Sequence, residues 1–319
     1  MSSASRSERR AVALVVVAAC AFGSLSIGVT LASRAGVALI ALMAWRYAIA
    51  APLLVLAAGG PAKVRVPVPR ALALLLLGGG GQTLITYLSF SSLDWLSAAQ
   101  LGFLFYTYPA WVAVLTAIAG IERLTPMRIV ALIVALAGIA VMVGTPWSAA
   151  LPLPGVARAL GSALIYAAYI PLLHRMRGPL DAAVASAWVI SGAAIVFCAW
   201  ALWRGVLLTG MTAPMWAIAL FAAVISTTVA FITFLRGLEV LGAVRTAILS
   251  TVEPFWTALL AALVLGQSIG RATLAGGFLI IVAIAAACIV LGAVGFAWWF
   301  SRRTQSNGVT VDVERLLAD

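Results

Sequence analysis

Two oppositely charged side chains lie deep inside apolar segments of this chain. Arg46 falls near the middle of a predicted helix at 36–58, and Glu253 near the middle of another at 242–265. A charge at the bilayer centre costs about 2.5–3.5 kcal/mol on insertion scales, so such groups usually face a cavity or a partner. We therefore predict one central polar site, in which Arg46 binds a solute carboxylate and Glu253 an amine or a proton. The alternatives are a structural ion pair, or an Arg46 whose charged end reaches the membrane surface.

Polar and aromatic side chains on neighbouring predicted helices could complete this site. They are Gln82, Thr86, Tyr87, Tyr106, Tyr108, Tyr166, Tyr169, Thr227 and Trp256. Tyrosine combines an apolar face with a hydrogen-bonding tip, which suits a cavity that accepts varied solutes. Helix packing and anchoring at the membrane interface are the alternative roles for each of them.

A proline occupies the same position in each half of the chain, at Pro109 and Pro254. Proline lacks a backbone donor and clashes with the carbonyl four residues earlier, so each helix is predicted to bend near its centre. Tyr108 and Glu253 immediately precede the two prolines and are therefore placed at the bends. A gating hinge and a kink that only improves packing both fit this position.

The prolines belong to an internal repeat, because residues 70–144 align without a gap with residues 215–289. The alignment pairs Leu93 with Leu238, Ala98 with Ala243, Leu104 with Leu249, Pro109 with Pro254, and Trp111 with Trp256. Five predicted helices per copy is an odd number, so the second copy enters the membrane from the opposite face. Inverted copies that can exchange shapes are typical of transporters with a site at the repeat interface. Duplication that only builds a larger scaffold is the alternative.

Composition places the chain in the membrane. It is 64% hydrophobic and 9% charged, with a mean hydropathy of +1.15, whereas a water-soluble protein needs a far more polar surface. Apolar runs near the ~20 residues that a spanning helix needs recur along the whole chain. The predicted fold class is an all-α integral membrane protein with ten transmembrane helices, arranged as two inverted five-helix repeats. The predicted segments are 11–31, 36–58, 70–91, 96–119, 126–144, 155–174, 182–203, 214–236, 242–265 and 272–295.

The distribution of the 20 lysines and arginines predicts the orientation. If the N-terminus is cytoplasmic, the outer side holds only Arg34, Arg158, Arg204 and Arg271, and all others except the mid-helix Arg46 lie inside. Both termini are therefore predicted to be cytoplasmic. The predicted divisions are a tail at 1–10, a first repeat at 11–144, a second repeat at 155–295 and a tail at 301–319. The first apolar run lacks the features of a cleaved signal peptide and is predicted to remain as a helix.

Several other functions have no support in the sequence. The formal charge of +11 is spread over short groups between apolar runs, which disfavours nucleic-acid binding. Cys20, Cys198 and Cys288 lack paired spacing, and His174 is the only histidine, so we expect neither a metal nor another cofactor. The glycines at 78–81 follow no strand and have no nearby Walker-type lysine, which argues against a phosphate loop. They would instead allow another backbone to approach closely, or allow the helix to flex.

The pattern resembles the EamA-type branch of the drug/metabolite transporter superfamily from about residue 11 to residue 292. The resemblance is carried by Ala44-Trp45-Arg46; by Leu93, Ala98 and Pro109 with Glu122-Arg123-Leu124-Thr125 and Gly138; and by Leu238, Ala243 and Pro254 with Gly266-Gln267. Gln267 stands where the family pattern favours glutamate. The resemblance implies a transporter of amino acids, other metabolites or toxic compounds. Described members of the family often export amino acids, including aromatic amino acids.

The leading hypothesis is a secondary transporter of the bacterial inner membrane that exports amino acids and related small metabolites by alternating access. Its expected partners are a small-molecule solute and the lipid bilayer, and we expect a monomer or a weak homo-oligomer. An exporter of drugs or toxic organic cations is the alternative within transport. A membrane enzyme would need an acid cluster that is missing beside His174 and Arg175, so no enzymatic activity is expected. A channel would more naturally repeat a filter around a symmetric pore.

Overall fold

The computed structural model describes residues 3–96, 98–121, 125–143, 152–266, 271, 274–279 and 281–282, and in these residues all regular structure is helical. The first repeat contains α1 (Ser3–Arg34), α2 (Leu39–Ala57), α3 (Val68–Leu76), η1 (Leu77–Gln82), α4 (Thr83–Ser91), η2 (Ser92–Asp94), α5 (Ala98–Phe105), α6 (Tyr108–Ile118) and α7 (Pro126–Val143). The second contains α8 (Leu153–Arg177), α9 (Ala182–Trp203), α10 (Ala213–Ala223), η3 (Val224–Val229), α11 (Ala230–Leu241), α12 (Ala243–Leu249) and α13 (Val252–Leu265). The all-helical prediction is confirmed.

Seven of the described helical segments are long and apolar enough to cross a membrane. They correspond to seven of the ten predicted segments. Two further predicted segments, 96–119 and 126–144, contain the shorter apolar helices Tyr108–Ile118 and Arg128–Val141. The last predicted segment, 272–295, and the predicted tail 301–319 lie largely or wholly outside the described residues. The first helix begins at Ser3, so residues 3–10 of the predicted N-terminal tail belong to α1.

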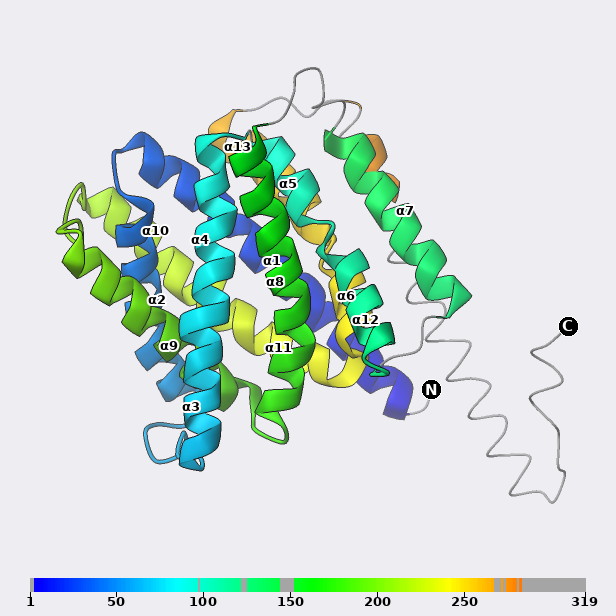
Figure 1. Cartoon of the computed structure of the whole chain (residues 1–319), viewed down its shortest axis with the longest axis horizontal. Coiled ribbons are helices and arrows are strands. Elements are labelled where there is room, and N and C mark those ends of the chain that lie inside the picture. Colours follow the sequence, from blue (N-terminus) through cyan, green and yellow to red (C-terminus); the bar gives the residue numbers. More distant parts are fainter. Residues whose placement is uncertain are drawn as a thin grey trace, which may run out of the picture.

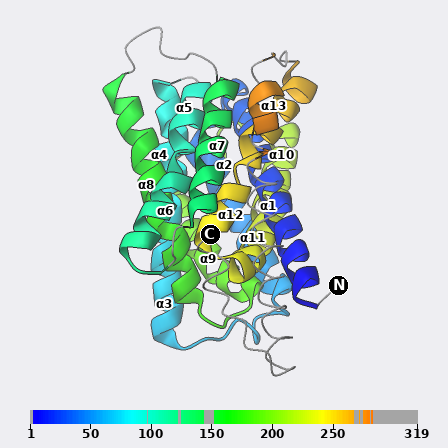
Figure 2. The same ribbon diagram turned by 90° about the vertical axis from the view of Figure 1, so that its right-hand side faces the viewer.

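Both repeats show the same irregularities in the same order. Their third helices each contain a π-helical segment, η1 in one and η3 in the other. Their fourth helices each break just before the shared proline, between α5 and α6 and between α12 and α13. The helices α1 and α8, which open the two repeats, run in opposite directions (Figures 1 and 2).

Helices of the two repeats interleave to form the bundle. In the first repeat, α1 packs against α11 and α13, and α2 packs along α9. In the second, α8 packs against α4 and α6. A continuous apolar core joins these helices and includes the fully buried Tyr47, Tyr108 and Phe197.

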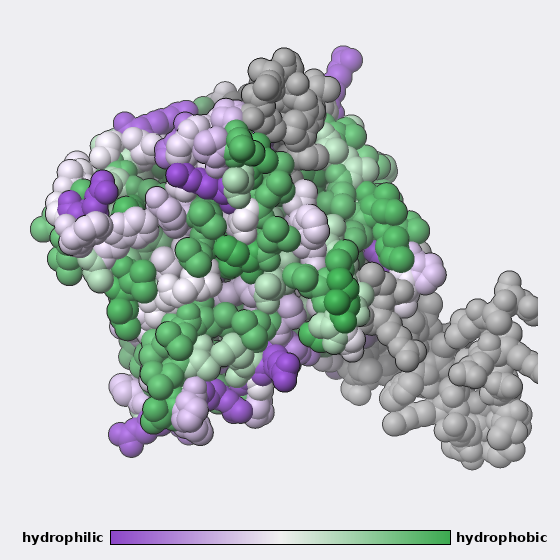
Figure 3. All heavy atoms as spheres, in the orientation of Figure 1, coloured by the Kyte–Doolittle hydropathy of each residue, from purple (hydrophilic) through white to green (hydrophobic). Residues whose placement is uncertain are grey.

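The exterior of the bundle is also apolar. Leu76, Ile118, Trp203 and Leu263 are between 73% and 81% exposed, and hydrophobic residues cover large areas of the face in Figure 3. Isolated exposed hydrophobic residues are ordinary, but large apolar areas on the surface are costly in water. The protein is therefore a multi-pass membrane protein.

Close backbone packing explains two glycines at the interface of η1 with α9. A Cβ atom on Gly78 would lie 1.8 Å from the carbonyl oxygen of Val189, and one on Gly192 would lie 2.1 Å from that of Leu75. Only glycine lets the two helices approach this closely. The predicted close approach of a backbone to the glycine run is therefore present.

Gly78→Ala is expected to destabilise the protein by about 1–3 kcal/mol, because the added methyl group forces the two backbones apart. Gly80→Ala is the matched control, since its Cβ would meet nothing within 4 Å and alanine favours a helix by up to about 1 kcal/mol over glycine. Thermal unfolding in detergent should show a lower Tm than wild type for Gly78→Ala but not for Gly80→Ala. Equal Tm values for the two variants would contradict this explanation.

Candidate functional site

A cavity of about 440 Å³ lies among the helices of both repeats. Residues of both repeats line it, from α1, α2, η1, α4, η2, α5 and α7 in the first and from α8, α11 and α13 in the second. Its lining reaches Thr30 near the end of α1, Leu93 near the end of η2 and Leu265 at the end of α13. The cavity therefore reaches the end of the bundle opposite the N-terminal residues of α1 (Figure 1), and we call this end the cavity mouth.

Seven of the eleven predicted binding residues line this one cavity. They are Arg46, Gln82, Thr86, Tyr106, Tyr166, Tyr169 and Glu253. Because they come from segments far apart in the sequence, only the folded bundle brings them together. Pro254, one of the two predicted hinges, also lines the cavity.

Arg46 is 3% exposed and is held by the second repeat. Its Nε donates to the Thr227 hydroxyl at 2.6 Å and its Nη2 to the Ser226 carbonyl at 3.1 Å. Its Nη1 has only a weak contact with the Met43 sulfur at 3.5 Å, and the guanidinium lies 4.6 Å from the centre of the Tyr47 ring. The guanidinium is thus fixed in direction but keeps unused N–H donors.

The π-helical segment η3 creates the acceptor for Arg46. The Thr227 hydroxyl donates to the carbonyl of Ala222, and the Thr228 hydroxyl to that of Ala223, each five residues earlier. The π-helical turn changes the backbone hydrogen-bond register, and the Ser226 carbonyl accepts from Arg46. Such π-helical turns occur frequently at functional sites. The sequence analysis did not predict this segment, although consecutive Ser226, Thr227 and Thr228 hydroxyls inside an apolar helix were a usable signal.

Glu253 stands in the first turn of α13, directly after the break that follows α12. Its half-buried side chain lines the cavity and interacts with the Tyr106 hydroxyl. The positive end of the helix dipole favours an anionic side chain in this first turn. No ion pair joins Glu253 to Arg46 or to any other described residue. Within the described residues, the two charges therefore share the cavity without forming the structural ion pair that the sequence left open.

Helix α1 holds α13 beside the cavity, which the sequence analysis did not predict. A Cβ on Gly23 would lie 2.9 Å from the Glu253 carbonyl oxygen, so α1 passes very close to α13. The Trp256 indole donates to the Ser24 hydroxyl at 2.9 Å, and the Thr257 hydroxyl donates to the Gly23 carbonyl at 3.1 Å. The small residues Gly23 and Ser24 in α1 were the available signal.

A buried hydroxyl and amide network fixes the polar side of the cavity. The Gln82 amide donates to the Tyr47 hydroxyl at 3.1 Å, and that hydroxyl lies 3.0 Å from the Thr86 hydroxyl. Tyr47 is fully buried and stacks on Phe197 at 5.5 Å. Gln82 and Thr86 thus reach the cavity on a rigid support that includes Tyr47, a residue absent from the predicted site.

Aromatic rings form another part of the cavity lining. Tyr166 stacks on Phe105 at 5.6 Å and lies 6.2 Å from Tyr169. The buried hydroxyl of Tyr169 has no hydrogen-bond partner in the part of the chain that the structure describes. A solute in the cavity can therefore contact the faces of these rings.

Four predicted binding residues do not line the cavity and instead support it. Tyr108 is 1% exposed and packs behind Tyr166 at 4.7 Å. Tyr87 packs on Trp200 at 4.7 Å, and the fully buried Thr227 accepts from Arg46. Trp256 donates to Ser24. Sequence alone could not assign these orientations, because each helix is apolar on several faces.

The two proline breaks place short half-helices at the cavity. Pro109 is buried in the first turn of α6, and Pro254 is buried in the first turn of α13. We expect Pro109→Ala and Pro254→Ala to slow transport more than they weaken solute binding, because a straightened helix alters the balance of states. A shift of about 1 kcal/mol in this balance changes a rate about fivefold.

Transport and binding measured on the same purified variants would test this expectation. Pro52→Ala is the control, since Pro52 lies inside α2 on its exposed side and lines no cavity. Wild-type transport rates in both Pro109→Ala and Pro254→Ala would make the prolines packing features only.

Comparison with known proteins agrees with this architecture. The model of the EamA-like transporter family matches residues 9–144 and again residues 153–292. No curated protein matches the chain. A solved structure titled "Crystal structure of protein" has the same fold, with a TM-score of 0.73 and 21% identity over 88% of this chain and 96% of that one. Because the family model covers most of the sequence in two copies, this chain belongs to the EamA-like transporter family.

Proposed function

We propose that this protein exports amino acids, aromatic ones included, and related small metabolites across the bacterial inner membrane. The observation that carries the proposal is the shared cavity, which presents Arg46 and Glu253 without an ion pair between them. A zwitterionic solute supplies one charge for each. The volume of the cavity, about 440 Å³, falls within the range of about 300–1,000 Å³ found for small-molecule sites.

Each part of an aromatic amino acid has a matching part of the cavity. The carboxylate would accept from the unused N–H donors of Arg46, in a charge-assisted hydrogen bond. The ammonium group would bind Glu253 beside Tyr106. The side chain would lie against the rings of Tyr166 and Tyr169, whose spacing suits offset stacking.

The proposed topology has ten transmembrane helices in two inverted repeats, with both termini in the cytoplasm. The excess of arginine and lysine at the end of the bundle that holds the N-terminus supports this orientation. The cavity then faces outward, and exchange of conformations between the repeats would turn it inward. We propose a monomer or weak homo-oligomer as the transporting unit.

Export of organic cations is the second candidate. The aromatic rings and Glu253 would bind a cation by cation–π and ionic contacts. The fixed charge of Arg46 in the same cavity repels such a solute, which favours the zwitterion.

A substrate panel on purified protein in liposomes tests both candidates, with and without an imposed pH gradient. Phenylalanine, phenethylamine and 3-phenylpropionate share the aromatic group but differ in charged groups, and a tetraalkylammonium ion represents organic cations. We expect phenylalanine to be exchanged fastest. Empty liposomes are the control. Faster exchange of the tetraalkylammonium ion would favour the second candidate, and no exchange of any of the four would contradict both.

A further inference from the structure

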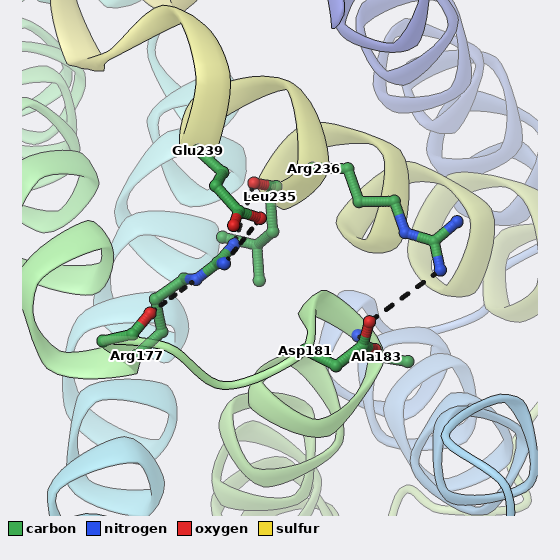
Figure 4. A network of polar contacts seen from close by, with 7 residues as sticks. Arg177, Asp181, Ala183, Leu235, Arg236 and Glu239 are labelled. Atoms are coloured by element: carbon green, nitrogen blue, oxygen red, sulfur yellow. Dashed lines mark hydrogen bonds and ion pairs between the residues drawn. The ribbon is translucent and has the colours of Figure 1, made fainter. Parts of the chain in front are cut away.

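Two ion pairs join α8, the start of α9 and α11 (Figure 4). They lie at the C-terminal end of α8, away from the end of α13 at the cavity mouth (Figure 1). Arg177 is 2% exposed, and its Nη2 lies 2.7 Å from an oxygen of Glu239. Its Nη1 also donates to the Leu235 carbonyl at 3.0 Å. A longer contact of 4.0 Å joins Arg236 to Asp181. These contacts hold α8 and the start of α9 against α11, and none of the four charged residues lines the cavity.

The first repeat has an arginine, Arg34, at the position that corresponds to Arg177 of the Arg177–Glu239 pair. Helix α1 ends at Arg34, as helix α8 ends at Arg177. The next helices begin at Leu39 and Ala182, so the intervening chain has the same length in both repeats. Each connection also contains a glycine with positive φ, 76° at Gly36 and 54° at Gly178. Arg34 and Arg177 are therefore equivalent residues.

The acid of the pair is repeated as well. The gap-free alignment of residues 70–144 with 215–289 pairs Asp94 with Glu239. The longer contact is not repeated, because Asp181 corresponds to Ala38 and Arg236 to Ser91. Of the two ion pairs, only Arg177–Glu239 therefore has an oppositely charged pair at the corresponding positions of the first repeat, namely Arg34 and Asp94.

The counterpart is open in this structure. Arg34 and Asp94 are both exposed, and neither forms an ion pair with a described residue. They flank the cavity mouth, since Thr30 and Leu93 of the same segments line the cavity. One charged pair is therefore formed at the end away from the cavity mouth, while its repeat-equivalent at the mouth is not formed.

We propose that Arg34 and Asp94 close into an ion pair over the cavity mouth when Arg177 and Glu239 separate. The four residues then act as positioning residues. The Arg177–Glu239 pair stabilises the outward-facing state, and the Arg34–Asp94 pair stabilises the inward-facing state. This inference rests on the alternating access of the proposed function. Arg158 is a competing partner for Asp94, because it donates to the Ser91 carbonyl and lies 3.9 Å from the centre of the Trp95 ring.

Disulfide cross-linking tests the alternation without a known solute. The double variants Arg34→Cys/Asp94→Cys and Arg177→Cys/Glu239→Cys are made in a background that has Cys20, Cys198 and Cys288 replaced by alanine. The first double variant is also combined with Glu239→Arg, which removes the inner pair at an exposed position. Each single cysteine variant controls for links between molecules, and Arg158→Cys/Asp94→Cys tests the competing partner.

The inner double variant should cross-link readily, and the outer one slowly. Adding Glu239→Arg should speed outer cross-linking severalfold, and reductant should reverse it. The proposal is overturned if the outer pair fails to cross-link even with Glu239→Arg, or if Asp94→Cys links faster to Arg158→Cys. Cross-linking that alternates as expected while no amino acid is exchanged would support the gate and reject the proposed solute. Amino-acid exchange without outer cross-linking would reject the gate and leave the proposed solute standing.

Discussion

Glu253→Gln is expected to weaken phenylalanine binding about ten- to hundredfold while the protein still folds. A hydrogen bond to a charged group contributes about 1.5–3 kcal/mol, and each 1.4 kcal/mol is a factor of ten in affinity. Glutamine keeps the size of the side chain and can still contact Tyr106, but it cannot neutralise an ammonium group. Most transport activity, or its dependence on a pH gradient, should be lost with the charge.

Matched solutes show whether the effect comes from the ammonium group. Isothermal titration of purified protein should show that Glu253→Gln also weakens phenethylamine but leaves 3-phenylpropionate nearly unchanged. Tyr106→Phe, which retains the carboxylate, should have a smaller effect. Full transport with an unchanged pH profile in Glu253→Gln would make this residue structural, and the site would then depend on Arg46 and the tyrosines.

Arg46→Lys is expected to show the opposite selectivity, with a loss of about ten- to hundredfold for solutes that carry a carboxylate. Lysine keeps the charge but lacks the planar fork that contacts Thr227 and Ser226 while leaving donors for the solute. Binding of 3-phenylpropionate and phenylalanine should fall, and binding of phenethylamine should not.

Thr227→Val separates this binding role from a structural one. The substitution removes the acceptor for Arg46 Nε but leaves the guanidinium in the cavity, so it should lower Tm more than it changes selectivity between the solutes. If Arg46→Lys and Thr227→Val lower Tm equally and neither distinguishes the three solutes, Arg46 only links the two repeats.

The sequence by itself determined the class of protein and much of its backbone plan. The high apolar content already requires a membrane environment, and the aligned positions of Pro109 and Pro254 predict matching breaks in two repeats. Both breaks are present, because proline cannot supply the backbone hydrogen bond that would continue the helix. The sequence also identified Arg46 and Glu253 as candidate site residues, because a charge near the middle of the membrane requires a polar environment.

Only the tertiary structure decided which side chains face the cavity and which support it. In a membrane bundle, lipid and protein core are both apolar, so hydropathy does not reveal which face of a helix points inward. Tyr166 lines the cavity while Tyr108 packs behind it, although both are tyrosines near the middle of apolar helices. The partners of Arg46 and of Arg177 come from helices far away in the chain. Such long-range contacts depend on how the helices pack, and no local pattern of residues encodes them.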